Sequence, residues 1–150
     1  MSVDLSIKIG SMVMKNPVTV ASGTFGYGPE YADLVDLNRL GAITVKGIGP
    51  EETLGNPTPR TFETRGGMLN AIGLPGPGAK GFIEKYVPFL KQYDVPVIVN
   101  IWGKCMEDYG KVVEVNRSTD QIIFEATITP PAAFFSILTM HRTERMPLYP

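Results

Sequence analysis

The clearest strand pattern in the chain is Pro96-Val97-Ile98-Val99-Asn100-Ile101, an apolar, largely β-branched run with one polar residue near its end. Two shorter runs of the same kind are residues 42–45 (Ala-Ile-Thr-Val) and residues 18–21 (Val-Thr-Val-Ala). Near-continuous apolar runs of this length are typical of strands buried on both faces of a parallel sheet. The three runs therefore predict the centre of such a sheet.

Helices are expected between these strands. Pro29 suits the first position of a helix that continues through Leu37 and stops at Gly41. Residues 82–93 predict a second helix, which Pro88 either kinks or divides. Residues 106–115 predict a third helix, and residues 122–124 a fourth strand. This alternation of strands and helices predicts an α/β fold with helical crossovers.

Two further segments complete the predicted architecture. Residues 5–16 indicate a small N-terminal β-hairpin with a two-residue turn at Gly10 and Ser11. Residues 48–78 form a long Gly- and Pro-rich stretch without a convincing long helix. Loops of this length are usually functional or disordered. The apolar residues inside the stretch favour an ordered, functional loop: Phe62, Met68, Leu69, Ile72 and Leu74.

Composition narrows the class of protein. The chain has 150 residues, of which 43% are hydrophobic and 19% are charged, as in one soluble domain. The net charge of −1 gives no sign of a nucleic-acid or anionic-membrane partner. The single cysteine, Cys105, and the single histidine, His141, exclude an internal disulfide and a Cys/His metal site. We expect a reducing, cytoplasmic setting, with no signal peptide at the N-terminus and no membrane span.

Ligands of parallel α/β folds bind at the carboxyl ends of the strands. Here those ends carry Ser22, Lys46 and Asn100, and the long loop adds Asn70 beside Gly73. A hydroxyl, an ammonium and carboxamides suit a flat, polar, heteroaromatic ligand, because lysine stabilises negative charge and asparagine both donates and accepts hydrogen bonds.

Each of these residues also has a simpler explanation. Ser22 with Gly23 could be only a turn, Lys46 a surface charge and Asn70 a turn former. Asn100 favours function, because it interrupts an apolar strand and a buried asparagine needs partners. Trp102 favours packing. The spacing of Gly23, Gly26 and Gly28 is GxxGxG and not GxGxxG, which argues against a dinucleotide-binding loop.

Seven motifs in order resemble the dihydroorotate dehydrogenase family, and above all the catalytic subunits of its NAD-linked class 1 (type B) enzymes. They are Lys15-Asn16-Pro17, residues 21–26 (Ala-Ser-Gly-Thr-Phe-Gly), residues 36–42 (Asp-Leu-Asn-Arg-Leu-Gly-Ala), Val45-Lys46-Gly47, Gly55-Asn56-Pro57 with Pro59-Arg60, residues 68–74 (Met-Leu-Asn-Ala-Ile-Gly-Leu) and residues 96–101. The resemblance covers roughly residues 5–115.

The resemblance implies the first three to four βα units of a (β/α)8 TIM barrel, behind the N-terminal β-hairpin. It implies FMN over the carboxyl mouth and oxidation of dihydroorotate to orotate in pyrimidine (UMP) biosynthesis. It places FMN against Ser22, Lys46, Gly47 and Asn100. It places the substrate against Lys46, Asn70, Ala71, Ile72, Gly73 and Leu74. It also implies a partner subunit that carries FAD and an iron–sulfur cluster, and we expect a homo-oligomer.

The chain also departs from the family pattern. A complete barrel needs roughly 250 residues, and the strands that usually grip the flavin phosphate are absent. The family's catalytic base is a cysteine after strand four, where the nearest counterpart here is residues 127–131 with Pro130 in its place. We therefore assign no catalytic residue, and expect weak FMN binding without appreciable turnover.

The domain organisation follows from where the family pattern ends. Residues 1–115 are expected to form the N-terminal half of an FMN-binding barrel, and residues 116–150 a divergent tail from a truncated, frameshifted or misassembled reading frame. The alternative is a non-catalytic half barrel that self-associates through its exposed sheet edges.

Overall fold

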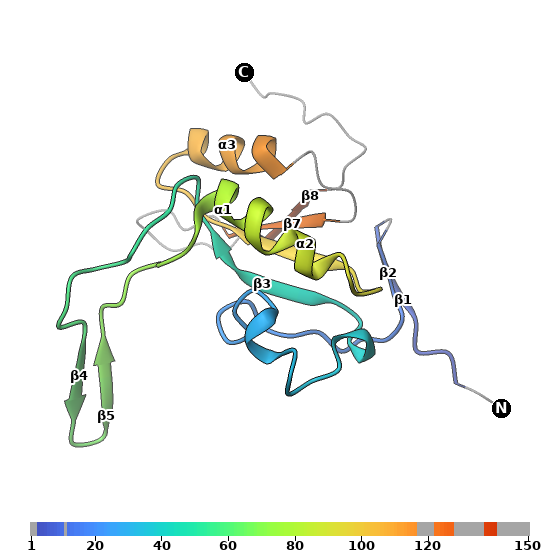
Figure 1. The fold of residues 1–150 in the computed structure, drawn as a ribbon, viewed down its shortest axis with the longest axis horizontal. Coiled ribbons are helices and arrows are strands. Elements are labelled where there is room, and N and C mark those ends of the chain that lie inside the picture. The colour runs from blue at the N-terminus through green and yellow to red at the C-terminus, as the bar shows by residue number, and fades with distance from the viewer. Residues whose placement is uncertain (1–2, 11, 117–121, 128–136, 141–150) are drawn as a thin grey trace.

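A four-stranded sheet forms the centre of the computed structural model, which describes residues 3–10, 12–116, 122–127 and 137–140 (Figure 1). The strands follow the order β3 (Ile43–Ile48), β6 (Val97–Ile101), β7 (Ile122–Thr127) and β8 (Ile137–Met140). The first three run parallel, and β8 pairs antiparallel with β7. The predicted α/β class with a parallel sheet is confirmed, whereas β8 was not predicted.

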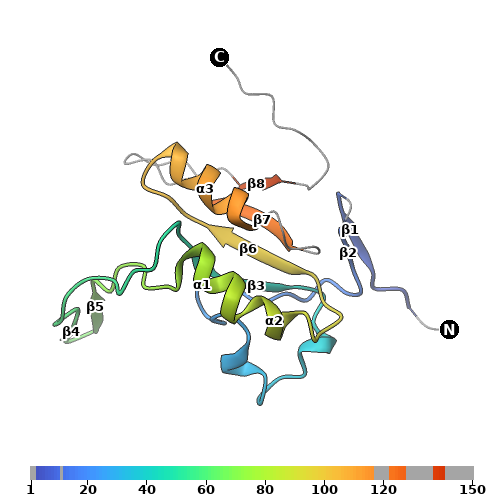
Figure 2. The ribbon, with the colours of Figure 1, turned by 45° about the horizontal axis from the view of Figure 1, so that its top comes forward.

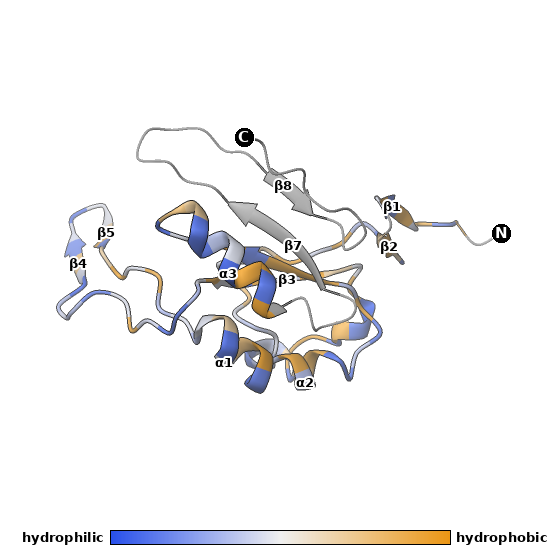
Figure 3. Cartoon of the chain, turned by 90° about the horizontal axis from the view of Figure 1, so that it is seen from above, coloured by the Kyte–Doolittle hydropathy of each residue, from blue (hydrophilic) through white to orange (hydrophobic). Residues whose placement is uncertain are grey.

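The helices that follow β3 and β6 pack against the sheet. They are α1 (Gly78–Lys85), α2 (Val87–Leu90) and α3 (Met106–Asn116). Pro88 lies at the start of α2, so of the two outcomes expected for this helix, a kink or a division, the structure shows the division, and α1 begins at Gly78 and not at Phe82. Figures 2 and 3 show α1 and α2 along one face of β3 and β6.

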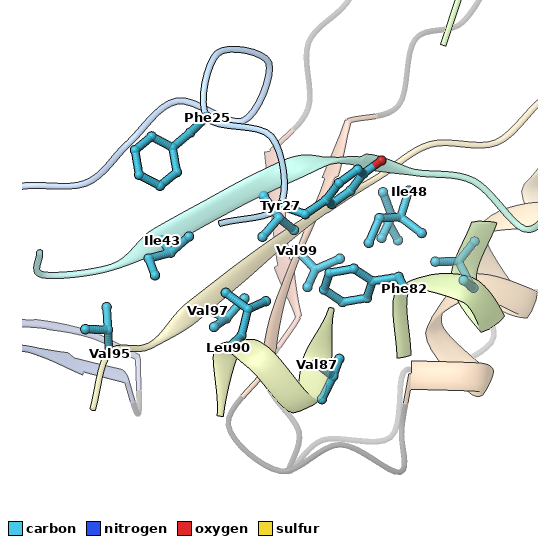
Figure 4. Packing of buried hydrophobic residues seen from close by; sticks show 14 of the residues in the cluster. Phe25, Tyr27, Ile43, Ile48, Phe82, Val87, Leu90, Val95, Val97 and Val99 are labelled. Atoms are coloured by element: carbon cyan, nitrogen blue, oxygen red, sulfur yellow. The ribbon is translucent and has the colours of Figure 1, made fainter. Parts of the chain in front are cut away.

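The core lies between this helical layer and the sheet. Phe82 of α1 is fully buried, as are Val45 of β3 and Val99 of β6, and all three belong to one apolar cluster (Figure 4). Val112 of α3, also fully buried, belongs to the same cluster. One face of the parallel sheet is therefore sealed by the crossover helices, which is the arrangement expected of βαβ units.

The predicted helix from Pro29 to Gly41 is wrong. The chain forms two 3₁₀ turns there, Pro29–Tyr31 and Leu37–Arg39. The Asp36 side chain, on an extended residue, accepts a hydrogen bond from the main-chain N–H of Asn38 (3.1 Å). Such local side-chain bonds offer the backbone an alternative to a continuous helix.

The predicted strand at residues 18–21 is reduced to one parallel bridge between Thr19 and Ala42. The Thr19 hydroxyl supports this bridge, because it donates to the carbonyl oxygen of Ala42 (3.1 Å) and shares a hydrogen bond with the Thr44 hydroxyl (3.2 Å). The segment therefore lies beside β3 in the expected order, with side-chain bonds in place of a full strand ladder.

The N-terminal strands cover the opposite end of the sheet from the predicted ligand-binding residues. Strands β1 (Ile7–Ile9) and β2 (Met12–Met14) pair antiparallel. Met12 and Met14 are buried against Ala42, the residue before β3, together with the half-buried Ile98. Because both contacts are at the amino ends of the strands, the carboxyl ends of β3 and β6 remain available for a ligand.

Polar side chains bind the segments around this amino end together. The Lys15 ammonium donates to the carbonyl oxygens of Asn38 (3.1 Å) and Asp94 (2.7 Å), and the Asn16 amide donates to the carbonyl oxygen of Arg39 (3.0 Å). The main-chain N–H of Gly41 donates to the carbonyl oxygen of Val18 (2.7 Å). Two of the motifs quoted above, residues 15–17 and 36–42, are therefore structural here.

In the described parts of the chain, no helix is long and apolar enough to cross a membrane.

Candidate functional site

A β-bulge at the carboxyl end of β3 brings three of the predicted ligand-binding residues together. Val45 pairs with Val99, and Ile48 pairs with Ile101. Three residue steps on β3 therefore match two steps on β6, so that Lys46 and Gly47 lie opposite Asn100. Bulges of this kind redirect side chains and are frequent beside active sites.

The bulge also explains the burial pattern around these residues. In a regular strand, residues three positions apart face opposite sides of the sheet. Val45 and Ile48 are nevertheless both 0% exposed in the same core cluster. The extra residue lets both side chains enter the core, and leaves Lys46 and Gly47 half-buried at the strand end.

The Lys46 ammonium makes no ion pair or hydrogen bond with the residues that the structure describes. Asn100, directly opposite, is half-buried like Lys46. Among the described residues, the carboxyl ends of β3 and β6 thus present a cation without a charged partner beside a carboxamide. Such a pair can stabilise negative charge on a bound ring and can fix the orientation of that ring by hydrogen bonds.

Glycines open the main chain beside this pair. A Cβ atom at Gly47 would lie 3.0 Å from Oδ1 of Asn100 and 3.2 Å from Cδ1 of Trp102. A Cβ atom at Gly49 would lie 2.6 Å from Cζ2 of Trp102. The indole therefore packs directly on bare backbone, as the packing interpretation of Trp102 predicted. The spacing Gly47-x-Gly49 was the sequence signal for this close approach.

The loop that contains Ser22 is tied to the end of β3. The main-chain N–H of Lys46 donates to the carbonyl oxygen of Gly26 (2.8 Å). The Glu30 carboxylate accepts a hydrogen bond from the main-chain N–H of Tyr27 (3.0 Å). Ser22 itself is half-buried in this loop. The contact to the strand end is therefore made by Gly26, a residue to which we assigned no role.

The long segment after β3 is an ordered arm, which we define as residues 53–76. Strands β4 (Thr61–Thr64) and β5 (Gly67–Asn70) pair antiparallel, and Thr53 and Gly76 exchange main-chain hydrogen bonds at its foot (3.0 and 2.9 Å). Figure 1 shows the arm projecting from the body of the molecule. The order that we expected in this segment is present, but the hairpin within it was not predicted.

The predicted substrate residues 70–74 lie on the returning side of the arm. These residues are exposed. Their main chain accepts hydrogen bonds from Asn56, another residue of the arm. The Asn56 side-chain amide donates to the carbonyl oxygen of Ala71 (2.7 Å), and the main-chain N–H of Asn56 donates to the carbonyl oxygen of Ile72 (2.9 Å). The structure thus gathers Lys46, Gly47 and Asn100 at the strand ends, whereas residues 70–74 lie on the arm.

Tyr27, for which no role was predicted, lies where the loop, the core and the arm meet. Its side chain is 5% exposed, and its ring centre lies 4.5 Å from that of Tyr86. Its hydroxyl is buried without a hydrogen-bond partner among the described residues. Burial, with smaller contributions from Tyr86 and Glu30, raises the pKa of Tyr27 to about 12.

The raised pKa predicts a loss of stability in alkali that depends on Tyr27. Its ordinary pKa is 10.0, so the folded state holds this proton more tightly than the unfolded chain does. The resulting stabilisation is complete below about pH 10 and is lost as the pH rises towards about 12. Denaturant unfolding at pH 9 and pH 11 should therefore show a smaller loss for Tyr27→Phe than for the wild type.

The matched control for this pH dependence is Tyr93→Phe, which removes a hydroxyl from a half-buried ring that packs on Phe89. We expect its loss of stability between pH 9 and pH 11 to equal that of the wild type. An equal loss in all three proteins would show that the Tyr27 hydroxyl does not titrate abnormally.

Neither a metal site nor the counterpart of the family's catalytic base is present among the described residues. No cluster of metal-ligating side chains occurs in the described ranges. Cys105 is exposed at the start of α3. The counterpart of the family's base loop begins at Thr127, the last residue of β7, and its remaining residues, 128–131, lie outside the described parts of the chain.

Parallel strands with crossover helices on the sheet, and polar side chains at the carboxyl ends of the strands, define an α/β protein; proteins of this class bind their ligands at this edge. The family model for dihydroorotate dehydrogenase matches residues 4–131. The chain therefore belongs to the dihydroorotate dehydrogenase family. The matched range continues past Val115, where the motif resemblance stopped.

Curated relatives agree with this assignment. The chain is 50% identical over 129 residues to the "Dihydroorotate dehydrogenase B (NAD(+)), catalytic subunit" of Alkaliphilus metalliredigens, which covers 86% of this chain and 43% of that protein. The protein of the same name from Lachnoclostridium phytofermentans is 55% identical over 126 residues, covering 84% of this chain and 42% of that protein. The chain thus spans less than half the length of these relatives.

A solved structure shares the fold. The DHODH of Eimeria tenella, in complex with ferulenol, superposes with a TM-score of 0.55 at 22% sequence identity. The superposition covers 81% of this chain and 36% of that chain. The similarity therefore concerns the fold and extends over most of the present chain.

Proposed function

We propose that this chain provides the N-terminal, cofactor-contacting part of a dihydroorotate dehydrogenase, which oxidises dihydroorotate to orotate in de novo pyrimidine biosynthesis. The observation that carries the proposal is the β-bulge that places Lys46 and Gly47 opposite Asn100. These are three of the four residues that the family resemblance assigns to FMN. The parallel strands β3, β6 and β7 would be consecutive strands of a partial (β/α)8 barrel, with β1 and β2 at its base.

The residues at the strand ends fit a flavin. Enzymes of this family use FMN, whose ring system is flat, polar and able to carry negative charge. Gly47 offers main chain without a side chain, which lets a flat ring approach closely. The Lys46 ammonium, which has no ion-pair partner in the described part of the chain, suits a ring that becomes negatively charged, and the Asn100 amide can both donate and accept.

In this arrangement Ser22, Lys46, Gly47 and Asn100 would hold FMN, which supplies the acceptor for the hydride of dihydroorotate. Lys46 and the segment Asn70, Ala71, Ile72, Gly73 and Leu74 would hold the substrate. Lys46 would therefore contact both and stabilise negative charge between them. Asn56 holds the main chain of this segment within the arm. The arm as a whole would therefore have to bring residues 70–74 to the strand ends.

The wider assignments follow from the same proposal. Residues 1–115 would form the FMN-binding half of the barrel together with β7, and within residues 116–150 the divergent tail would begin only after residue 131, where the family match ends. The electron acceptor would be a partner subunit that carries FAD and an iron–sulfur cluster, and the complex would be cytoplasmic. The names of the relatives, NAD(+)-linked catalytic subunits, support the partner assignment.

FMN binding can be measured directly with the chain's one tryptophan. Trp102 packs against Gly47 and Gly49, so FMN at the strand ends should quench its fluorescence. We expect Lys46→Ala to weaken FMN binding about tenfold, the size of a lost hydrogen bond from a partly exposed charged group. The control, Lys80→Ala, removes an exposed lysine of α1 and should leave the affinity within twofold.

Unchanged affinity in Lys46→Ala would remove Lys46 from the cofactor site. Wild-type protein without any quenching would contradict the proposed function and favour a second candidate, a non-catalytic half barrel that self-associates. That candidate is favoured by the exposed apolar side chains of the arm, among which Leu54 is 82% and Phe62 is 73% exposed. A colourless dimer in sedimentation equilibrium would be its signature.

A further inference from the structure

Backbone hydrogen bonds hold the segment around Tyr27 at the end of β3. The residue before Tyr27, Gly26, accepts a hydrogen bond from the main-chain N–H of Lys46 (2.8 Å). The N–H of Tyr27 donates to the Glu30 carboxylate (3.0 Å), which folds the loop back on itself. The Cα of Tyr27 is therefore fixed relative to the strand end that carries Lys46 and Gly47.

The Tyr27 side chain is fixed as well. Its ring centre lies 4.5 Å from that of Tyr86 and 6.0 Å from that of Phe82, both from the helical layer. Figure 4 shows the ring beside β3, with its hydroxyl directed towards the strand end near Ile48. The ring is packed between β3 and the helical layer in a close-packed core, so it is held in one position and the position of its hydroxyl is fixed as well.

The Tyr27 hydroxyl lies beside Gly76, one of the two residues at the foot of the arm. A Cβ atom at Gly76 would lie 2.8 Å from the Tyr27 hydroxyl oxygen and 3.8 Å from the carbonyl oxygen of Gly47. Gly76 also exchanges both main-chain hydrogen bonds with Thr53, which closes the arm. The side of Gly76 on which a side chain would stand thus faces both the Tyr27 hydroxyl and the carbonyl oxygen of Gly47 in the bulge of β3.

The hydroxyl makes this contact without a hydrogen bond to any described residue. A buried hydroxyl without a partner is costly compared with the phenylalanine that would fill the same ring site. The oxygen instead lengthens the ring, because it extends the side chain into the space beside Gly76 where a Cβ atom would stand.

We propose that Tyr27 is a positioning residue whose hydroxyl end holds the foot of the arm at a fixed distance from the Lys46–Gly47 strand end. The arm carries residues 70–74, and its foot is the pair of chain segments nearest to that strand end. Tyr27 thereby sets where residues 70–74 lie relative to the cofactor residues. This last consequence rests on the proposed function, whereas the position of the foot does not.

The test is amide hydrogen exchange of the whole chain. Tyr27→Phe keeps the ring and removes the oxygen, so the amides of Thr53 and Gly76 should exchange about fivefold faster, while those of Val99 and Ile101 in β6 stay within about twofold. The matched control, Tyr93→Phe, removes a half-buried hydroxyl away from the arm and should leave the foot unchanged. Unchanged exchange at Thr53 and Gly76 in Tyr27→Phe, or equal acceleration throughout the sheet, overturns the proposal.

In a Gly76→Ala background the effect of Tyr27→Phe should have the opposite sign. Gly76→Ala places a methyl group against the Tyr27 hydroxyl and should accelerate exchange at the foot about tenfold. Adding Tyr27→Phe removes the clash, so the double variant should exchange more slowly than Gly76→Ala alone. Additive acceleration in the double variant contradicts a direct contact between the two positions.

The expected effect of Tyr27→Phe on substrate binding is measured in a separate experiment. In FMN-loaded protein, Tyr27→Phe should weaken orotate binding about fivefold, measured by the shift of the flavin spectrum, and leave FMN affinity within about twofold. Equal loss of both affinities points to general damage and contradicts positioning of the substrate segment. A wild-type chain that takes up no FMN contradicts the proposed function alone, since the exchange measurements still decide the role of Tyr27.

Discussion

Gly41→Ala is expected to lower the midpoint of thermal unfolding by about 10 °C, which corresponds to a loss of about 3 kcal/mol in this size of domain. A Cβ atom at Gly41 would overlap the carbonyl oxygen of Asn16. That oxygen belongs to the main chain, so it cannot rotate away as a side chain would. Overpacking of this kind costs about 1–3 kcal/mol, and displacement of the hydrogen bond from Gly41 to Val18 adds about 1 kcal/mol.

The control for Gly41→Ala is Gly110→Ala on the exposed side of α3, where an added Cβ atom meets nothing within 4 Å. This change should raise stability by about 0.5–1 kcal/mol, because alanine favours a helix over glycine. Differential scanning calorimetry of both variants separates the two effects. A shift of less than about 2 °C in Gly41→Ala would show that the segments around Asn16 and Gly41 are free to separate.

The role of Gly41 illustrates what the sequence could not reveal. Its position after Leu37 and Leu40 predicted the end of a helix, but the structure uses it where residues 16–18 cross closely behind it. The contact joins segments that are more than 20 residues apart in the sequence. Local patterns contain no information about such a crossing, whereas the apolar runs of β3 and β6 are local and were found.

The same distinction holds for the helices and the arm. Pro88 divides a helix through its own ring, so that break was predictable from one residue. The hairpin of β4 and β5 was not, because its residues are exposed on both faces and show no alternation. Its order comes from contacts across the arm, such as those of the Asn56 amide and of Arg60, whose guanidinium donates to the carbonyl oxygen of Leu54 (2.9 Å).

For the candidate site, the strand-end rule identified Lys46 and Asn100, because it depends only on where apolar runs stop. It could not predict the bulge, which is a matter of register between two strands about 50 residues apart. It also overlooked Tyr27 and Gly26, because their importance comes from the close approach of the loop to β3. Residues that act by contact across the fold are therefore the ones that sequence reasoning missed.

The bulge itself leads to the prediction with the largest effect on binding. Gly47→Val should weaken FMN binding by at least about 30-fold, which corresponds to about 2 kcal/mol. A Cβ atom at this position already lies 3.0 Å from Oδ1 of Asn100 and 3.2 Å from the Trp102 ring. The two γ-methyl groups of valine must therefore push these side chains away or enter the space beside Lys46, and both alternatives disturb the surface on which a flavin would lie.

The control for Gly47→Val is Gly67→Val, because a Cβ atom at Gly67, in the exposed strand β5, meets nothing within 4 Å. Flavin fluorescence in equilibrium dialysis is the better readout, since Gly47→Val also moves Trp102 and alters its emission. If Gly47→Val bound FMN as tightly as Gly67→Val and the wild type, the flavin could not lie against the bulge. The cofactor would then have to contact another edge of the sheet, and the coincidence of Lys46, Gly47 and Asn100 would reflect the packing of Trp102 alone.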